Sequence, residues 1–181
     1  VRVFKKARLD THKLVEEFML LANREVAEYI ETLSKKAAGK YHPFVYRIHD
    51  LPDQEKIKEL SIFAKALGYE LHIKKDGQVS NKDLNALLQQ VEGKAEEGLV
   101  KTAAVRTMAK AIYTTKNIGH FGLAFQYYTH FTSPIRRYPD VLVHRLLEKH
   151  LAGQPVSSEE IVELEKLSAH STDREIAAAE A

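Results

Sequence analysis

Arginine, histidine and aromatic side chains concentrate in residues 120–145, HFGLAFQYYTHFTSPIRRYPDVLVHR. Six Phe and Tyr rings lie here among His120, His130, Arg136 and Arg137. Arginine matches the geometry of phosphate, and aromatic rings stack on nucleic-acid bases. The mixture indicates an anion site flanked by aromatics, as in proteins that bind single-stranded nucleic acid. Three of the rings are open to a second interpretation, because aromatic clusters also form ordinary core: Phe121, Phe125 and Phe131.

The two arginines follow a helix-start signature, since Ser133 can cap a helix and Pro134 suits its first turn. Arg136 and Arg137 would then lie in that first turn. Cations there are unfavourable by about 0.3–1 kcal/mol each, so the pair calls for an anion. Phosphate would satisfy both the arginines and the free N–H groups of the turn. A surface cap or an ion pair within the chain is the alternative.

Pro139 limits the helix that carries this pair, because proline in a helix interior costs about 3 kcal/mol. Either residues 133–138 form a separate turn and the helix restarts at Pro139, or the helix is kinked there. Both arrangements place Arg136 on a constrained turn. The helix then continues on apolar residues until Gly153 ends it.

The same stretch resembles a known family. The segment YTHFTSPIRRYPDVLVHRLL, preceded by HFGL, is similar to the signature of the catalytic RNB domain of the ribonuclease II and ribonuclease R family of 3′-to-5′ exoribonucleases. LVEEFMLLANREVA at residues 14–27 and STDREIAAAEA at 171–181 resemble the helices that precede and follow it. The resemblance is weak between residues 40 and 110.

That resemblance implies hydrolysis of RNA from its 3′ end to nucleoside monophosphates, with magnesium assisting the attack of water. Arg136 matches the family residue that holds the phosphate near the scissile bond and stabilises charge on its oxygens. Further residues are carried over as lining or bracing the RNA channel, with Arg137 and Tyr138 in supporting roles: His120, His130, Thr132, Ser133, Arg137, Tyr138, Glu17 and Asn23. For Asn23 the sequence alone favours a structural role, an inter-helix hydrogen bond that fixes register.

The magnesium ligands are not found in this sequence. The family supplies them as closely spaced aspartates upstream of the part seen here, whereas the aspartates of this chain are scattered. We therefore expect the chain to be inactive in isolation and to lack metal ligands. Two alternatives stay open. One is a metal site built from Asp140 and His144, four residues apart on one helix face, with His120 or His130. The other is a module that binds single-stranded RNA without cutting it.

Composition agrees with a soluble globular domain. The 181 residues are 44% hydrophobic and 29% charged, with a net charge of +2, so any nucleic-acid binding must come from a local patch. The absence of cysteine excludes disulfides, thiolate zinc sites and thiol nucleophiles. With no secretory or membrane-spanning stretch, we expect a cytoplasmic protein. The chain opens on VRVFKKAR, and we expect residues 1–181 to be the C-terminal portion of a single RNB domain, truncated at both ends.

The elements that must position this site form a mostly helical α+β fold. Apolar spacing and capping signals predict helices over residues 10–38, 53–67, 80–93, 94–111, 139–152 and 157–181. Short strands are predicted near residues 1–4, 43–48, 69–73 and 111–115, in a sheet completed by the missing part of the domain. We expect that missing part and flanking RNA-binding domains as partners. Apolar surface left exposed where the missing part belongs would favour self-association of the isolated chain.

Overall fold

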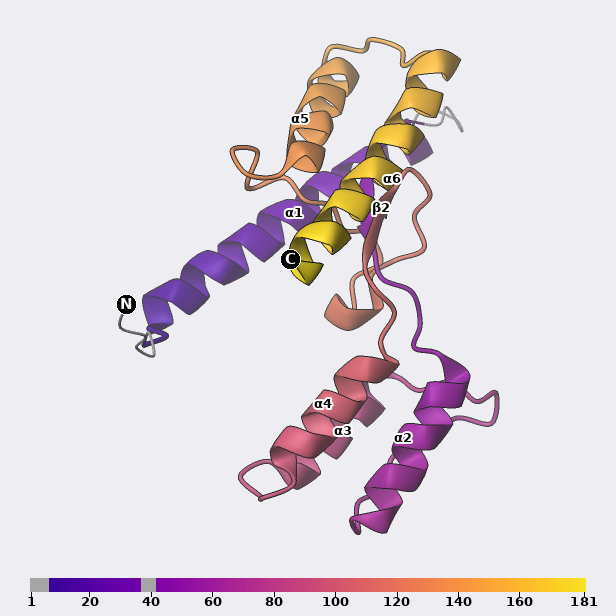
Figure 1. Cartoon of the computed structure of the whole chain (residues 1–181). Helices are drawn as coiled ribbons and strands as arrows, with labels where there is room; N and C mark the ends of the chain where they lie inside the picture. Colours follow the sequence, from indigo (N-terminus) through magenta and orange to yellow (C-terminus); the bar gives the residue numbers. More distant parts are fainter. Residues whose placement is uncertain (1–6, 37–41) are drawn as a thin grey trace. The chain divides into compact units, whose positions relative to one another are not determined.

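The computed structural model describes residues 7–36 and 42–181, and most of these residues are helical (Figure 1). The α-helices are α1 (Asp10–Lys36), α2 (Gln54–Ala66), α3 (Asn81–Val91), α4 (Glu97–Thr107), α5 (Tyr138–Leu151) and α6 (Ser158–Glu180). A 3₁₀ helix, η1, spans Phe121–Leu123. The strands β1 (Tyr46–Ile48) and β2 (Ile112–Thr114) pair into a two-stranded sheet. The predicted α+β class with mostly helical content is confirmed.

Contacts between residues divide the chain into two compact units. The first contains the chain up to Arg47, together with Ile112–Asn117 and Tyr127–Ala181. The second contains Ile48–Ala111 and Ile118–Gln126. The chain therefore passes between the units several times. The assignment of the whole chain to a single RNB domain stays a prediction.

In the first unit, α6 packs along β2 and against α5 (Figure 1). Side chains from several elements are fully buried there, among them Ile30 of α1, Phe44 before β1 and Val143 of α5. The loop that follows the second unit is tied to β1, because the Arg47 N–H donates to the Tyr128 carbonyl at 2.9 Å. This packing fixes the ends of the segment that carries the arginine pair.

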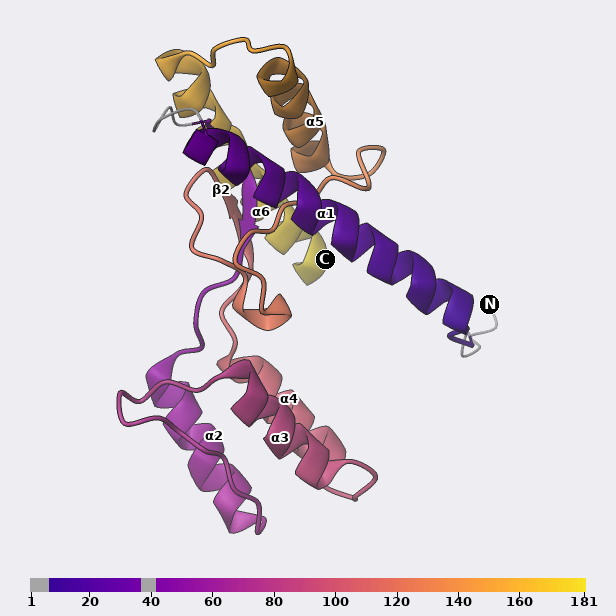
Figure 2. The same ribbon diagram turned by 180° about the vertical axis from the view of Figure 1, so that it is seen from behind.

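The second unit is built on α2, α3 and α4, with α4 packed on both of the others (Figure 2). Its core consists of aliphatic side chains such as Ile57, Leu87 and Val100. The predicted starts of α2 and α3 are confirmed by their caps, whereas α4, expected from Lys94, begins at Glu97 without a side-chain cap. The Asp53 carboxylate accepts from two N–H groups of α2, and Ser80 forms a capping box with Asp83 at α3.

The predicted strand at residues 69–73 is wrong. This segment is extended but pairs with no strand among the described residues, because the side-chain amide of Gln90 takes the hydrogen bonds that a strand would. Gln90 accepts from the Glu70 N–H at 3.1 Å and donates to the Glu70 carbonyl at 2.9 Å. The apolar alternation reflects burial of Leu71 against the helices. The strand predicted at residues 1–4 lies outside the described residues.

The strands expected near residues 43–48 and 111–115 are present as β1 and β2, which pair with each other. Completion of this sheet by a part of the domain outside the chain stays a prediction. No described helix is both long enough and apolar enough to cross a membrane.

Candidate nucleic-acid interface

Arg136 lies on a turn that immediately precedes α5. The backbone N–H groups of Arg136 and Arg137 both donate to the Ser133 carbonyl, at 3.2 and 3.1 Å. The helix itself begins at Tyr138, with Pro139 in its first turn, where the missing N–H has no cost. The separate-turn arrangement is therefore the right one. The prediction that both arginines lie within a helical first turn is wrong, because Pro139 delays the start of the helix.

Asp140 supplies the anion at the N-terminus of α5. Its carboxylate is fully buried and accepts from the Ser133 N–H and from the Arg137 guanidinium, both at 2.8 Å. A carboxylate in the first turn also interacts favourably with the helix dipole. Arg137 is thus paired within the chain, which corrects the expectation that both arginines need an external phosphate. Arg137 and Ser133 brace the turn.

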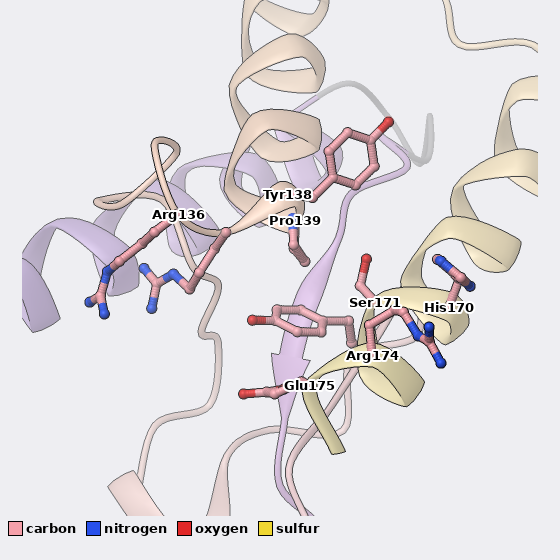
Figure 3. A pocket seen from close by; sticks show the side chains of 9 residues that line it. Arg136, Tyr138, Pro139, His170, Ser171, Arg174 and Glu175 are labelled. Carbon is pink, nitrogen blue, oxygen red and sulfur yellow. The ribbon is translucent and has the colours of Figure 1, made fainter. Parts of the chain in front are cut away.

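Arg136 is the arginine left for a ligand. It is exposed, and its guanidinium makes no hydrogen bond or ion pair with any other described residue. Its neighbour Ile135 is 98% exposed, so the turn projects from the surface. Arg136 lines a pocket of about 500 Å³, together with Tyr138 and residues of α6 (Figure 3). An anion can reach this guanidinium without displacing a partner in the described part of the chain.

The opposite wall of the pocket comes from α6, through His170, Ser171, Arg174 and Glu175 (Figure 3). None of these was singled out from the sequence. His170 immediately precedes the segment STDREIAAAEA, and the other three residues lie within it. The sequence signal that could have identified them was the charged pair Arg174-Glu175 on a helix that resembles a family helix.

Glu175 joins this wall to the sheet. Its two carboxylate oxygens accept from the Arg47 guanidinium at 2.5 and 3.0 Å, a bidentate pair. The same guanidinium lies 4.4 Å from the centre of the Tyr113 ring, over its face. Arg47 on β1, Tyr113 on β2 and Glu175 on α6 therefore hold three elements together beside the pocket.

His130 lies in a network of two tyrosines. The Tyr113 hydroxyl and His130 Nδ1 are 2.8 Å apart, and the Tyr128 ring meets the His130 ring edge to face at 5.7 Å. Burial raises the pKa of Tyr113 to about 12 and also raises the pKa of Tyr128. Both phenols therefore stay neutral at physiological pH.

Asn23 holds the loop before the turn. Its carboxamide oxygen accepts from the N–H groups of Phe131 and Thr132 at 2.9 and 3.2 Å, and its nitrogen donates to the Tyr128 hydroxyl at 3.1 Å. Asn23 is only 3% exposed. The bonds are structural, as the sequence favoured, but they join α1 to a loop and not to a second helix. Thr132 Oγ1 is buried and has no hydrogen-bond partner within the described part of the chain.

Two of the predicted RNA-binding residues take no part in this network. Glu17 is exposed on α1, and its side chain has no hydrogen bond or ion pair to another described residue. His120 belongs to the second unit, where it caps η1 by accepting from the Leu123 N–H at 3.2 Å, and its ring lies 5.1 Å from that of His49. Neither lines the pocket around Arg136.

The phenylalanines of the segment are partly buried and also lie outside that pocket. Phe121 packs on the helical core of the second unit. Phe131 stacks on His144 with ring centres 4.1 Å apart. The pocket draws its aromatic lining from Tyr113 and Tyr138 instead.

No group of three or more His, Asp or Glu residues is arranged to hold a metal within residues 7–36 and 42–181. Asp140 is committed to Ser133 and Arg137, and His144 Nε2 lies 2.9 Å from the Phe131 carbonyl. The alternative metal site at Asp140 and His144 is therefore wrong. The residues described here do not fit a magnesium site.

Known proteins of one family resemble this chain in sequence. The profile of the RNB domain matches residues 1–153. Ribonuclease R of Aquifex aeolicus is 42% identical over 171 residues, which cover 94% of this chain and 23% of that protein. Ribonuclease R of Thermotoga maritima is 40% identical, with 100% of this chain and 25% of that protein covered. The chain thus spans about a quarter of the length of these relatives.

Solved structures show the same likeness. Mycoplasma genitalium RNase R in complex with ribose-methylated single-stranded RNA matches with a TM-score of 0.79 and 28% identity, over 94% of this chain and 26% of that one. Yeast Ssd1, a pseudonuclease, shares the fold with a TM-score of 0.71 at 22% identity, over 92% of this chain and 20% of that one. On the match to the RNB profile and the likeness to ribonuclease R, the chain belongs to the RNB domain family.

Proposed function

We propose that the full-length protein is a 3′-to-5′ exoribonuclease that hydrolyses RNA to nucleoside monophosphates, and that this chain supplies its phosphate-holding residue, Arg136. The observation that carries the proposal is the exposed guanidinium of Arg136, without a partner among the described residues, on a turn in a pocket. The names of the relatives, ribonuclease R, support the reaction class.

The turn suits this role because it is ordered without a ligand. Ser133 and Asp140 hold the backbone, and the pairing of Asp140 with Arg137 leaves Arg136 free. A guanidinium on a turn that is ordered before the ligand binds can donate two parallel hydrogen bonds to a phosphate. It can also stabilise negative charge that develops on the phosphate oxygens. Thr132, Ser133, Arg137 and the Asn23-anchored loop would then act by keeping the turn in place.

The substrate we propose is single-stranded RNA. Structures of Mycoplasma genitalium RNase R were determined with single-stranded and with double-stranded RNA, at 28% identity to this chain. The exposed Arg136 and the half-exposed ring of Tyr138 give this chain a charge and a stacking surface for such a strand.

Magnesium enters the proposal only through the full-length protein. Since the described residues do not fit a metal site, we assign the ligands to residues outside them and assign no step of the reaction to the metal here. We expect the 181-residue chain alone to release no nucleotides from RNA under conditions in which the full-length protein does.

The test is Arg136→Ala in the full-length protein. Removing a group that stabilises charge in the transition state should slow single-turnover cleavage by about 10²–10³-fold. RNA affinity should fall by less than about tenfold, because the contact to only one phosphate is lost from a long interface. Single-turnover rates and equilibrium RNA binding measure the two effects separately.

Arg145→Ala is the matched control, since it removes an exposed arginine of α5 that does not line this pocket. It should leave the cleavage rate within about twofold of wild type. An equal loss of rate and affinity in Arg136→Ala would make Arg136 a binding residue and contradict the proposed role.

The second candidate is an RNA-binding module that does not cut. The fold alone is compatible with it, because the pseudonuclease Ssd1 shares that fold. Incubating the full-length protein and magnesium with RNA labelled at its 5′ end decides between them. Progressive shortening with release of mononucleotides supports the exoribonuclease, whereas tight binding of RNA that stays intact supports the non-catalytic module.

A further inference from the structure

Two arginines from different elements line the pocket in the first unit. Arg136 comes from the turn before α5, and Arg174 comes from α6 on the other side (Figure 3). Both are exposed. The pocket is large enough, at about 500 Å³, for a ligand that reaches both walls.

The other charges of the pocket are already balanced within the chain. Arg137 is paired with the buried Asp140. Glu175, the acidic residue that lines the pocket, is held by both nitrogens of the Arg47 fork. Neither the Arg136 nor the Arg174 side chain has a hydrogen bond or ion pair to any residue in the described part of the chain. Two positive charges are therefore left for a ligand.

The helix that carries Arg174 is fixed on both sides of that residue. Thr172 Oγ1 accepts from the Tyr113 N–H of β2 at 3.0 Å, and Glu175 binds Arg47 of β1. Nearer the N-terminus of α6, Glu165 accepts from the hydroxyl of Thr115. Only the side chain of Arg174 has to be ordered by a ligand, so little binding free energy is lost in positioning it.

We infer that Arg174 is a second contact to the RNA backbone, which binds a phosphate neighbouring the one held by Arg136. The inference rests on the proposed function and extends it from one phosphate to two. Figure 3 shows the Arg136 and Arg174 side chains extending in opposite directions from the pocket, so a strand that crosses it meets two separate cationic sites. The half-exposed ring of Tyr138 lines the same pocket and offers a surface on which a base can stack.

The experiment measures RNA affinity of the full-length protein across a series of salt concentrations. Arg174→Gln should raise the Kd about tenfold and reduce the slope of log K against log[salt] by about 0.7, the value for one phosphate contact to a single strand. Arg174→Lys keeps the charge and should keep the slope. Thermal unfolding midpoints equal to wild type show that these exposed substitutions leave the fold intact.

Lys166→Gln is the matched control. It removes an exposed cation from the same helix, outside the pocket, and should change neither the Kd nor the slope. If Arg174→Gln behaves like Lys166→Gln, the inference is overturned.

Neutral phosphates locate the contact. In a set of RNA oligonucleotides, each has one phosphate replaced by a neutral methylphosphonate. At one position this replacement should weaken binding to the wild-type protein but leave the affinity of Arg174→Gln unchanged. Arg136→Gln should be insensitive at a different position. Insensitivity of both variants at the same phosphate would contradict two separate contacts.

The two proposals can fail separately. Loss of cleavage in Arg136→Ala together with wild-type salt dependence in Arg174→Gln would keep the exoribonuclease and remove the second contact. Full-length protein that neither binds nor shortens RNA would remove both.

Discussion

Asn23 shows how a single buried side chain can set the geometry of a site that it does not line. Its carboxamide uses its oxygen for two backbone N–H groups of the loop and its nitrogen for Tyr128. The loop leads within a few residues to Arg136. We therefore treat Asn23 as a residue that positions the turn.

Asn23→Ala should lower the free energy of unfolding by about 2–4 kcal/mol, because it leaves two partly buried backbone N–H groups without their acceptor. Tyr128→Phe removes only the hydroxyl that Asn23 contacts and should lower it by about 1 kcal/mol. Urea denaturation followed by circular dichroism measures both. Equal losses in the two variants would show that Asn23 does not anchor the loop.

Only the family resemblance predicted which of the two arginines is available to bind a ligand. Spacing alone placed Arg136 and Arg137 together and could not separate them. The separation depends on Asp140, which is drawn into the core to bind Ser133 and Arg137. Asp140 lies three residues after Arg137 and four after Arg136, so spacing allows an ion pair with either arginine and does not say which one forms.

Among the elements, α5 is held at both ends. Asp140 fixes its start, and near its end His150 Nε2 lies 2.8 Å from the Pro43 carbonyl, just before β1. His150 is 8% exposed, and burial lowers the pKa of its imidazole below the usual range. The neutral form is thus favoured in the folded state.

A pH dependence of stability follows. The unfolded chain binds a proton at His150 near pH 6.5 and the folded chain only at lower pH, so stability falls as pH drops from about 6.5 through the folded pKa. His150→Gln keeps an N–H donor and does not titrate. Wild type should therefore lose more unfolding free energy than His150→Gln between pH 7 and 5, measured by urea denaturation at each pH. Parallel losses would contradict a buried neutral imidazole.

Element prediction succeeded where the signal is local. The caps at Asp53, Ser80 and Ser157 mark helix starts, and all three are observed. It failed at residues 69–73, where Gln90, distant in sequence, takes the backbone hydrogen bonds of an extended segment. Apolar alternation records burial on one side and does not reveal what lies on the other.

At the scale of the whole molecule, α1 carries an apolar stripe without a partner among the described residues. Leu14, Phe18 and Leu21 recur at helical spacing and are 56%, 62% and 43% exposed. Contiguous exposed apolar side chains of this kind mark surfaces that associate.

The isolated 181-residue chain should therefore self-associate, with a mean mass that rises with concentration in size-exclusion chromatography with light scattering. The double substitution Leu14→Ser and Phe18→Ser should restore the monomer mass. Ile62→Ser, which removes a single apolar side chain of α2 that is 72% exposed, should not. A monomer at every concentration would show that the stripe does not drive association.

The ion pair between Arg47 and Glu175 joins residues 128 positions apart in the chain. Because a protein is made from its N-terminus, β1 leaves the ribosome long before α6 exists to meet it. The wall that carries Arg174 is completed only after α6 has emerged. A nascent chain consequently lacks the complete pocket around Arg136 until α6 has been synthesised and has met β1.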